Sequence, residues 1–478
     1  MIRTDSRKVQ TGDTFVALPG ISSNGDQYIG QAIKAGASVI VCRKAADAAG
    51  QAEICGHLEG TDASGAPSFL YTDDPRNYLE ELLVKEYGSV VSQMTLIALT
   101  GTNGKTTTCY LIASALNRLG RNCAYIGTIG FFLNEKVRDL PNTSVDICDL
   151  YELLLEAHEA GFDTVALEAS SQGIDKGRLN TLSFDIAAFT NLTEDHLDYH
   201  KTMERYAAAK QQLFRHIKPG GTALVNADDP YRSYFILEGN TTVTYGLETG
   251  DVQAADYQFE HGTLLHYTCP GQAHTAGRKI YEAHTALIGR YNVYNTMAVI
   301  GILHILGYDP QDISFALEGL QAPDGRCDTI VWHGAHIVID YAHTPDAVAK
   351  IMETAREFTT GRMFVVFGCT GDRERQKRPV MTQLVLTGCD YAVITDDDVH
   401  SESEQQIVDD MLQGNTRTNY EVCLDRKEAI HRGIRLLREG DSLLILGKGH
   451  EEYIIMDGYT IPHNDRKAVL QFIETQES

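Results

Sequence analysis

Apolar and polar positions alternate along the chain in patterns that predict strands and helices following one another. Short apolar runs bounded by polar residues or glycine are typical of strands, and apolar residues three or four positions apart are typical of amphipathic helices. In the first section of the chain, these patterns predict strands at residues 14–18 and 37–42, helices at 27–35 and 77–86, and a loop of small residues at 60–67. The pattern changes near residue 90.

A second section begins there with an apolar strand and a glycine turn. It is predicted to contain a strand at residues 94–99, a turn at 101–104, a helix from Lys105, and further strands at 164–167, 186–189 and 223–225. Strands that alternate with helices favour a mostly parallel, doubly wound sheet, in which sites form beyond the carboxyl ends of the strands.

The third section begins near Arg326 and repeats the alternation. Strands are predicted at residues 337–339, 363–367, 391–394 and 442–445, and a helix at 347–358. We therefore expect an α/β protein of three domains. A smaller N-terminal α/β domain would span residues 1–90, a central P-loop ATPase domain with a mostly parallel sheet 91–325, and a C-terminal Rossmann-like domain 326–478.

Composition narrows the functional classes. The 478 residues are 43% hydrophobic and 22% charged, which is ordinary for a globular protein. The net charge of -24 and the lack of a Lys/Arg-rich run argue against nucleic acid as a partner. No apolar run approaches the length of a membrane span, and the N-terminus is polar, so we expect a cytoplasmic monomer without membrane insertion. The ten cysteines are scattered and form no C-x-x-C pair, which disfavours a zinc site.

The strongest local motif lies between the predicted strand at 94–99 and the helix from Lys105. A glycine turn at this position presents backbone N–H groups and the positive end of a helix to an anion. Lys105 supplies a charge for the outer phosphates of a nucleotide, and the Thr106 hydroxyl is a suitable Mg²⁺ ligand. The loop is shorter in its middle than the common phosphate-binding form. The expected ATP-binding residues are Gly101, Thr102, Asn103, Gly104, Lys105, Thr106 and Thr107.

Two further strand ends carry groups that suit a metal or a phosphate. Glu168 ends the predicted strand at 164–167, and Asp195 and His196 follow the strand at 186–189. A carboxylate and an imidazole at neighbouring strand ends could share magnesium ions with ATP. Alone, each is more often an ordinary polar loop residue. The phosphate loop in the same sheet favours the functional interpretation.

Taken in order, the motifs of the chain resemble the Mur ligase family, and most closely its UDP-N-acetylmuramoyl-tripeptide synthetase branch. The resemblance covers nearly the whole chain. It rests on Asp5-Ser6-Arg7, residues 100–107, Glu168-Ala169-Ser170-Ser171, Thr190-Asn191, residues 195–200, Tyr206 to Lys210, Asn292-Val293-Tyr294-Asn295, Gly325-Arg326, Asp340-Tyr341-Ala342-His343 and Gly447-Lys448-Gly449-His450-Glu451.

The resemblance implies an ADP-forming ligase that takes ATP, Mg²⁺, a UDP-N-acetylmuramoyl dipeptide and a free amino acid in peptidoglycan synthesis. ATP would phosphorylate the terminal D-glutamate carboxylate, and the amine of the amino acid would attack the acyl phosphate. Because water would also attack, domain closure around the substrates is expected.

The resemblance also implies roles for single residues. Thr106 and Glu168 would hold one magnesium ion, and His196 with a carbamylated Lys210 (N6-carboxylysine) the other. Lys105, Glu168, His196 and Lys210 would be the catalytic group. By itself, Lys210 would be taken for a solvated helix lysine. ATP would also contact Asn292, Arg326, Asp340 and His343, and the UDP-substrate Ser6, Arg7, Thr143, Ser144, Ser170 and Arg178.

The pocket for the added amino acid departs from the family pattern. Family members that use meso-diaminopimelate carry Asp-Asn-Pro-Arg where this chain has Asp397-Asp398-Val399-His400. The run from Asp396 to Asp398 favours a cationic side-chain end, so lysine or ornithine is predicted. Asp397 and Glu451 would lie near the terminal ammonium, with Arg373 on the α-carboxylate. The predicted pocket residues are Arg373, Asp397, Asp398, His400, Gly447 and Glu451.

Other interpretations stay open. A protonated His400 could bind a carboxylate, which keeps diaminopimelate as the alternative substrate. The acidic run could also be a solvated loop, and Gln172, where many relatives have histidine, puts one substrate contact in doubt. A related ligase such as folylpolyglutamate synthetase and a nucleotide-binding protein without catalysis are the rival functions.

Overall fold

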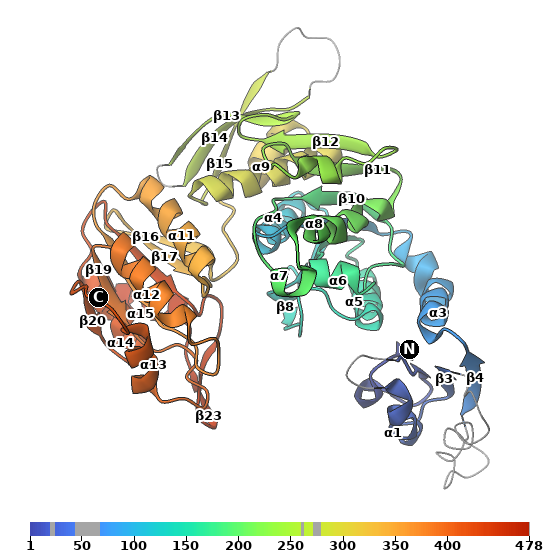
Figure 1. Ribbon diagram of the computed structural model, residues 1–478. Coiled ribbons are helices and arrows are strands. Elements are labelled where there is room, and N and C mark those ends of the chain that lie inside the picture. The colour runs from blue at the N-terminus through green and yellow to red at the C-terminus, as the bar shows by residue number, and fades with distance from the viewer. Residues whose placement is uncertain (20–23, 44–66, 260–261, 271–278, 478) are drawn as a thin grey trace.

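Parallel strands organise each of the three lobes of the computed structural model (Figure 1). The structure describes residues 1–19, 24–43, 67–259, 262–270 and 279–477. The predicted loop at residues 60–67 lies, apart from Pro67, outside these ranges.

The N-terminal lobe contains a parallel sheet in the order β1-β2-β3-β4. Its elements are β1 (Ile2–Arg3), η1 (Ser6–Lys8), β2 (Thr14–Val16), η2 (Gly25–Tyr28), α1 (Ile29–Lys34), β3 (Val39–Arg43) and β4 (Ser68–Thr72). Helix α3 (Pro75–Val91) leads into the middle lobe. It begins before the predicted helix at 77–86 because Asp74 caps its first turn and Pro75 suits the first helical position, and it also continues further, to Val91.

The middle lobe contains one sheet in the order β15-β14-β13-β12-β11-β10-β5-β9-β6-β7-β8. The strands from β13 to β6 in this order are parallel, which confirms the mostly parallel sheet, although β6, β12 and β13 were not among the predicted strands. Strands β14, β15, β7 and β8 add antiparallel ends that were not predicted either. The strands are β5 (Thr95–Thr100), β6 (Cys123–Gly127), β7 (Gly130–Leu133), β8 (Glu135–Arg138), β9 (Thr164–Glu168), β10 (Phe184–Phe189), β11 (Ile217–Asn226), β12 (Thr241–Gly246), β13 (Val252–Phe259), β14 (Thr263–Thr268) and β15 (Ile280–Thr285).

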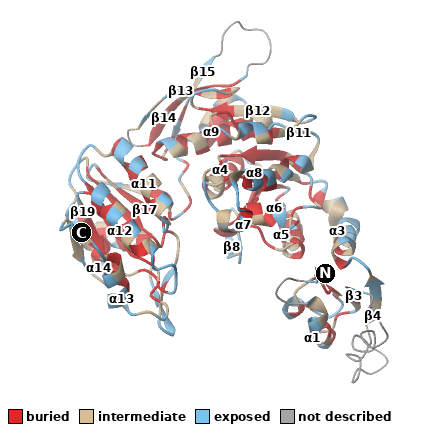
Figure 2. Ribbon diagram, in the orientation of Figure 1, coloured by how far each residue is buried: buried red, intermediate tan, exposed pale blue. Residues whose placement is uncertain are grey.

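Helices cover both faces of this sheet, because side chains point alternately to the two sides of each strand. Leu96 and Ala98 of β5 pack in the cluster that includes α3 and α5, whereas Ile97 and Leu99 pack with α4, α9 and α10. The buried residues of Figure 2 follow these layers. The remaining elements are α4 (Lys105–Arg118), α5 (Ile147–Glu159), α6 (Ser171–Asp175), α7 (Leu197–His200), α8 (Met203–Gln211), η3 (Gln212–His216), η4 (Arg232–Phe235), α9 (Arg290–Ile305) and α10 (Pro310–Leu317).

The C-terminal lobe has a second doubly wound sheet, in the order β16-β17-β21-β18-β19-β20, with only β16 antiparallel to its neighbour. Its strands are β16 (Arg326–Trp332), β17 (Ala335–Asp340), β18 (Met363–Phe367), β19 (Tyr391–Ile394), β20 (Tyr420–Val422) and β21 (Ser442–Leu446), followed by the hairpin β22 (Tyr453–Met456) and β23 (Tyr459–Pro462). The predicted bounds of β18 and β19 are confirmed.

Helices on the two sides of this second sheet belong to separate hydrophobic clusters. One side contains α11 (Pro345–Phe358), α12 (Lys377–Gly388) and α13 (Glu404–Met411), and the other contains α14 (Arg426–Arg435) and α15 (Asp465–Glu477). The predicted fold class, three-domain α/β with mostly parallel sheets, is confirmed.

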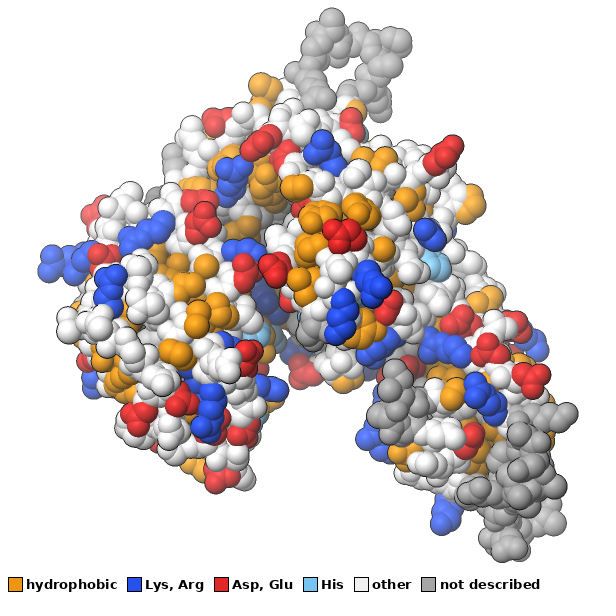
Figure 3. Space-filling view, in the orientation of Figure 1, with side chains coloured by type: hydrophobic (Ala, Val, Ile, Leu, Met, Phe, Trp, Pro, Cys, Tyr) orange, Lys and Arg blue, Asp and Glu red, His pale blue; other side chains and the backbone are white. Residues whose placement is uncertain are grey.

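The described residues also bear on the exclusions made from composition. Their cysteines are free thiols, and all except the half-buried Cys423 are buried. Over the described ranges, no helix is both long and apolar enough to span a membrane. Acidic and basic side chains are interspersed over the face shown in Figure 3.

A buried ion pair joins α14 to α15 near the end of β21, where Arg426 also donates to the Leu446 carbonyl. Arg426 donates two hydrogen bonds of 2.8 Å to Asp465, and both side chains have 0% exposure. Replacing Asp465 with alanine is expected to cost about 3–5 kcal/mol of unfolding free energy, because it leaves the guanidinium buried without its partner. Denaturant unfolding followed by the fluorescence of Trp332 measures this, since the chain has one tryptophan and its ring lies 6.1 Å from that of Phe472 on α15.

Glu353→Ala is the matched control for that experiment. Glu353 lies on the exposed side of α11 in the same lobe, and surface substitutions of this kind change stability by about 0.5 kcal/mol or less. Equal losses in the two variants would contradict a special contribution of the Arg426–Asp465 pair.

Candidate active site

The phosphate loop lies where β5 ends and α4 begins, as predicted. Two of its positions require glycine. Gly101 has φ +153°, and an added Cβ would lie 1.9 Å from Oγ1 of Thr190; Gly104 has φ +83°, and its Cβ would lie 2.5 Å from Oδ1 of Asn295. Thr190 also donates a 2.7 Å hydrogen bond to the carbonyl of Asn103. The end of β10 therefore holds the loop in a shape that exposes backbone N–H groups at the start of α4.

Lys105 folds back over this loop. Its Nζ donates to the carbonyls of Gly101 (3.0 Å) and Thr102 (2.9 Å). Burial lowers the pKa of Lys105, while the charge of Glu168 opposes that effect, and Arg326 from the C-terminal lobe lowers it further. The ammonium is thus held at the phosphate loop by carbonyl oxygens, which a bound phosphate can replace as acceptors.

Glu168 is the most connected carboxylate of the site. It is buried at the end of β9 and accepts hydrogen bonds from Thr106 Oγ1 (2.9 Å), the Thr128 backbone N (2.9 Å), Thr128 Oγ1 (3.1 Å) and the Tyr125 hydroxyl. The oxygens of Glu168 and Thr106 are the hard ligands that Mg²⁺ prefers. The predicted first pair of metal ligands is therefore brought together, and the donor set fits the ion.

Lys210 approaches the same loop from α8. Its side chain is buried, and Nζ donates a 2.7 Å hydrogen bond to the Gly101 carbonyl and lies 4.5 Å from the centre of the Tyr206 ring. Burial, and then the charge of Lys105, lowers the pKa of Lys210 well below its usual value. The interpretation of Lys210 as a solvated helix lysine is wrong, because α8 packs this residue against the phosphate loop.

His196 also lies near the Tyr206 ring. It has a left-handed backbone with φ +53°, is half exposed, and its ring centre lies 6.2 Å from that of Tyr206. Among the described residues, no group of three or more His, Cys, Asp and Glu side chains is arranged to hold a metal ion. The predicted second pair, His196 and Lys210, thus lies around one aromatic ring, that of Tyr206.

Four of the predicted UDP-substrate residues form one polar network beside Glu168. Oγ of Ser144 lies 3.0 Å from Oγ of Ser170 and donates to the Glu168 backbone carbonyl at 3.1 Å. Arg178 donates to the Ser144 carbonyl, and Oγ1 of Thr143 lies 3.0 Å from Oγ1 of Thr128.

The other two predicted residues of this group, Ser6 and Arg7, belong to the N-terminal lobe. Ser6 donates a hydrogen bond to Gln31, and the exposed Arg7 forms an ion pair with Asp5. Neighbouring residues join this lobe to α5, because Lys8 contacts Asp149 and Arg3 contacts Glu152. Ser6 and Arg7 are thus on the segment that touches the middle lobe, but the structure does not bring them into the Ser144 network.

The predicted ATP contacts from the C-terminal lobe gather around Tyr341. The Arg326 guanidinium lies 5.0 Å from the centre of this ring, and the His343 ring lies 4.8 Å from it. Nε of Arg326 is buried and has no hydrogen-bond partner in the described part of the chain, so it remains available to an acceptor such as a phosphate. Asp340 accepts from the backbone N of Cys327 and of Ala342, both at 2.8 Å.

Asn292 is buried at the start of α9, where it is hydrogen-bonded to Asn295. It accepts from Asn295 Nδ2 at 3.0 Å, and Asn295 in turn accepts from Thr108 Oγ1 on α4 at 3.1 Å. This contact ties α9 to the helix of the phosphate loop. Residue-by-residue prediction missed Asn295, although it ends the motif that begins at Asn292.

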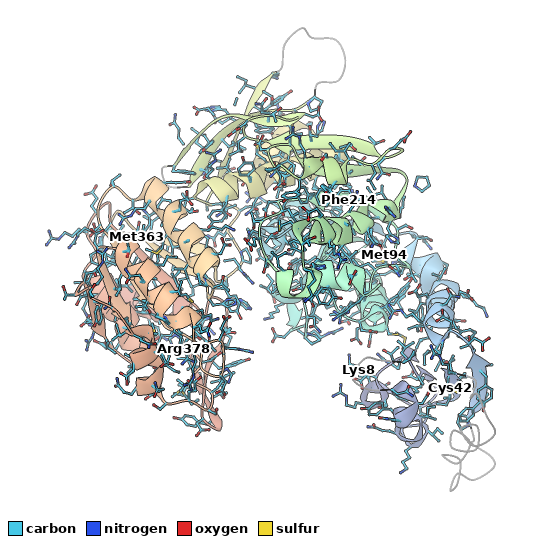
Figure 4. The ribbon with its side chains drawn as sticks, viewed as in Figure 1. Lys8, Cys42, Met94, Phe214, Met363 and Arg378 are labelled. Carbon is cyan, nitrogen blue, oxygen red and sulfur yellow. The ribbon has the colours of Figure 1, made fainter. Side chains whose placement is uncertain are left out.

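The predicted amino-acid pocket lies beyond the carboxyl ends of three neighbouring strands, β21, β18 and β19. Arg373 is exposed in the loop after β18, and the half-buried His400 follows β19 with φ +54°. Glu402 joins these loops, because it accepts from the Asp372 backbone N at 2.7 Å and pairs with Arg378 of α12. Figure 4 labels Arg378, whose side chain is fully buried in this lobe.

The acidic run of this pocket is not a set of free charges. Asp398 pairs with Lys448 at 2.7 Å, and Lys448 also contacts Glu451. Burial and the neighbouring Glu404 raise the pKa of Asp396 to about 7. Sequence analysis missed the role of Lys448, although the residue lies in the motif of Gly447 and Glu451. The net negative charge of residues Asp396 to Asp398 is therefore smaller than the sequence alone indicates.

Comparison with known proteins finds relatives along nearly the whole chain. Models described as the Mur ligase family catalytic domain, the Mur ligase middle domain and the Mur ligase glutamate ligase domain match residues 1–68, 99–303 and 325–449. A UDP-N-acetylmuramoyl-L-alanyl-D-glutamate–2,6-diaminopimelate ligase from Syntrophomonas wolfei is 33% identical over 483 residues, which cover 99% of this chain and 94% of the relative.

Solved structures show the same likeness. A structure of a UDP-N-acetylmuramoyl-L-alanyl-D-glutamate–2,6-diaminopimelate ligase matches with a TM-score of 0.70 and 30% identity over 100% of this chain and 95% of the other. A folylpolyglutamate synthase of Mycobacterium tuberculosis, complexed with ADP and AMPPCP, matches with a TM-score of 0.58 and 16% identity over 77% and 91%. The match to the folylpolyglutamate synthase shows a shared fold only.

Proposed function

Because this chain belongs to the Mur ligase family, we propose that it adds meso-diaminopimelate to UDP-N-acetylmuramoyl-L-alanyl-D-glutamate. The chain is an ATP-dependent ligase that joins an acid to an amino acid in cell-wall peptidoglycan synthesis. The observation that supports the chemistry most directly is the gathering of Lys105, Thr106, Glu168 and Lys210 around one phosphate loop.

The choice of diaminopimelate replaces the lysine or ornithine that the acidic run favoured. The Syntrophomonas relative, which carries diaminopimelate in its name, aligns over almost the whole chain. The ion pair of Asp398 with Lys448 also removes part of the reason for a cationic substrate. Asp397, which is buried beside Gly447, remains the feature that favours lysine or ornithine as the second candidate.

The proposed reaction begins with transfer of the γ-phosphoryl group of ATP to the D-glutamate carboxylate, which forms a P–O bond and releases ADP. Lys105 and the N–H groups at the start of α4 stabilise the charge on the transferring group. Bound magnesium, held by Thr106 with Glu168 and by His196 with carbamylated Lys210, would supply further positive charge. Arg326 brings its unpaired Nε to the same phosphates from the C-terminal lobe.

In the second step, the neutral amine of the incoming amino acid attacks the acyl carbon, a proton leaves the nitrogen, and inorganic phosphate departs. The amino acid is proposed to bind Arg373, Asp397, His400, Gly447 and Glu451, beyond the ends of β18, β19 and β21. Water must be kept from the acyl phosphate, so the lobes are proposed to close around the substrates.

The remaining assignments are part of the same proposal. Domains would span residues 1–90, 91–325 and 326–478, and the protein would act as a cytoplasmic monomer. Asn292, Asp340 and His343 complete the ATP site. The UDP-substrate site is proposed to contain Ser6, Arg7, Thr143, Ser144, Ser170 and Arg178.

An assay of phosphate release tests the proposal. Purified protein receives ATP, Mg²⁺, UDP-N-acetylmuramoyl-L-alanyl-D-glutamate and one amino acid at a time: meso-diaminopimelate, L-lysine or L-ornithine. Diaminopimelate is expected to stimulate release with a kcat/KM at least about tenfold above that for lysine, because one extra satisfied polar group is worth at least that factor. Stimulation by lysine or ornithine alone would overturn the substrate choice. Release that no amino acid stimulates would overturn the ligase proposal itself.

A further inference from the structure

Lys448 is a buried cation in the loop after β21, and the proposed reaction gives it no role. Its side chain has 0% exposure, and its Nζ lies 2.7 Å from Oδ1 of Asp398 and also contacts Glu451. Lysine is almost never fully buried unless it is paired. Although burial opposes the charge, Asp397 and the two contacting carboxylates outweigh it and raise the pKa of Lys448.

Asp398 is held by several segments around the proposed pocket. Besides Lys448, its Oδ1 accepts a 2.8 Å hydrogen bond from the backbone N of Ile455 in β22. Its backbone carbonyl accepts a 2.7 Å bond from the N–H of Gly371, in the loop that carries Arg373. The carboxylate of Asp398 is therefore fixed against the protein, and a protein cation matches its charge.

Asp397 is in a different position. It is buried, and its Oδ2 faces Gly447 so closely that an added Cβ there would lie 2.3 Å away. Oδ1 accepts from the backbone N of Asp398 at 2.6 Å. Within the described ranges, Asp397 forms no ion pair with a lysine, arginine or histidine. Asp397 is thus the one of these three carboxylates that Lys448 does not contact directly, although its charge still helps to raise the pKa of Lys448.

We propose that Lys448 determines the amino-acid specificity of this pocket by holding Asp398 and Glu451 in ion pairs, so that the substrate meets the charge of Asp397. The inference rests on the proposed function, which puts the amino acid in this pocket. Each carboxylate released into the pocket would strengthen binding of a side chain that ends in an ammonium. It would weaken binding of one that also carries a carboxylate. Lys448 therefore favours diaminopimelate over lysine.

Two substitutions that change the charge of the pocket in opposite directions test this inference in the full-length protein. Lys448→Gln makes the pocket more negative and is expected to lower the ratio of the lysine KM to the diaminopimelate KM about tenfold, the order expected for one charge in a partly buried site. Asp398→Asn makes it less negative and is expected to raise the same ratio. For an amino acid that is not turned over, its inhibition constant replaces KM, so the ratio is measurable even if the proposed substrate is wrong.

Conservative and neighbouring variants complete the design. Lys448→Arg keeps the charge and is expected to keep the ratio, and Glu452→Gln removes an exposed acid next to the pocket as the matched control. The KM for ATP should stay unchanged throughout. If Lys448 is only structural, both amino-acid KM values rise together and the ratio stays constant. That result, or shifts of the two test variants in the same direction, overturns the inference. If Lys448→Gln fails to fold, Asp398→Asn decides the question, because it leaves Lys448 paired with Glu451.

Discussion

Lys105→Ala is expected to lower kcat by at least about 10²–10³-fold, the loss that follows removal of one preorganised charge-stabilising donor. The ammonium lies at the mouth of the phosphate loop, where it is held by the Gly101 and Thr102 carbonyls. Its contribution is largest when charge spreads over the transferring phosphoryl group. The KM for the amino acid should change far less, because the proposed amino-acid pocket lies in the C-terminal lobe.

Steady-state phosphate release at saturating ATP measures this effect. Lys85→Ala is the matched control, since Lys85 is exposed on α3 and the substitution is the same. Its kcat should equal that of the unchanged chain. A Lys105→Ala enzyme that retains more than about a tenth of the activity would show that the lysine is not needed for phosphoryl transfer.

The phosphate loop could be predicted from sequence because its chemistry is local. Gly101 and Gly104 are needed where the backbone turns and approaches Thr190 and Asn295 closely, and the lysine and threonine follow at once. The regular alternation of strands and helices likewise predicted the two doubly wound sheets, because strands buried on both faces are continuous apolar runs. These features depend on near neighbours in the chain.

Other features depend on contacts between distant segments. The partners of Glu168 include Tyr125 and Thr128, which no local pattern connects to it. Lys448 and Asp398 are 50 positions apart, so the acidic run was interpreted without the cation that pairs with it. The antiparallel strands β14 and β15 were also missed, because β13 to β15 alternate polar and apolar residues at an edge and produce a weaker signal.

Lys210→Ala is expected to reduce kcat at least about 10³-fold, comparable to loss of a group that stabilises charge in phosphoryl transfer. A short carboxylate such as acetate or formate should restore part of the activity. The substitution opens space beside Gly101 and Tyr206, where Nζ now lies, and a small acid can bring an anionic oxygen there as a carbamate would. Phosphate release measured over a range of acid concentrations checks both parts.

Two comparisons separate a carbamate from an ordinary cation at this position. Lys210→Arg keeps a positive charge near the loop but cannot form the N6-carboxyl group, so it should be as inactive as the alanine variant. The same acids added to Lys105→Ala should restore nothing, because the missing group there is a cation. Full activity of Lys210→Ala would remove the residue from the reaction. An active Lys210→Arg enzyme would instead mean that a positive charge at position 210, and not a carbamate, is needed for the reaction. The lysine carries that charge when it is protonated.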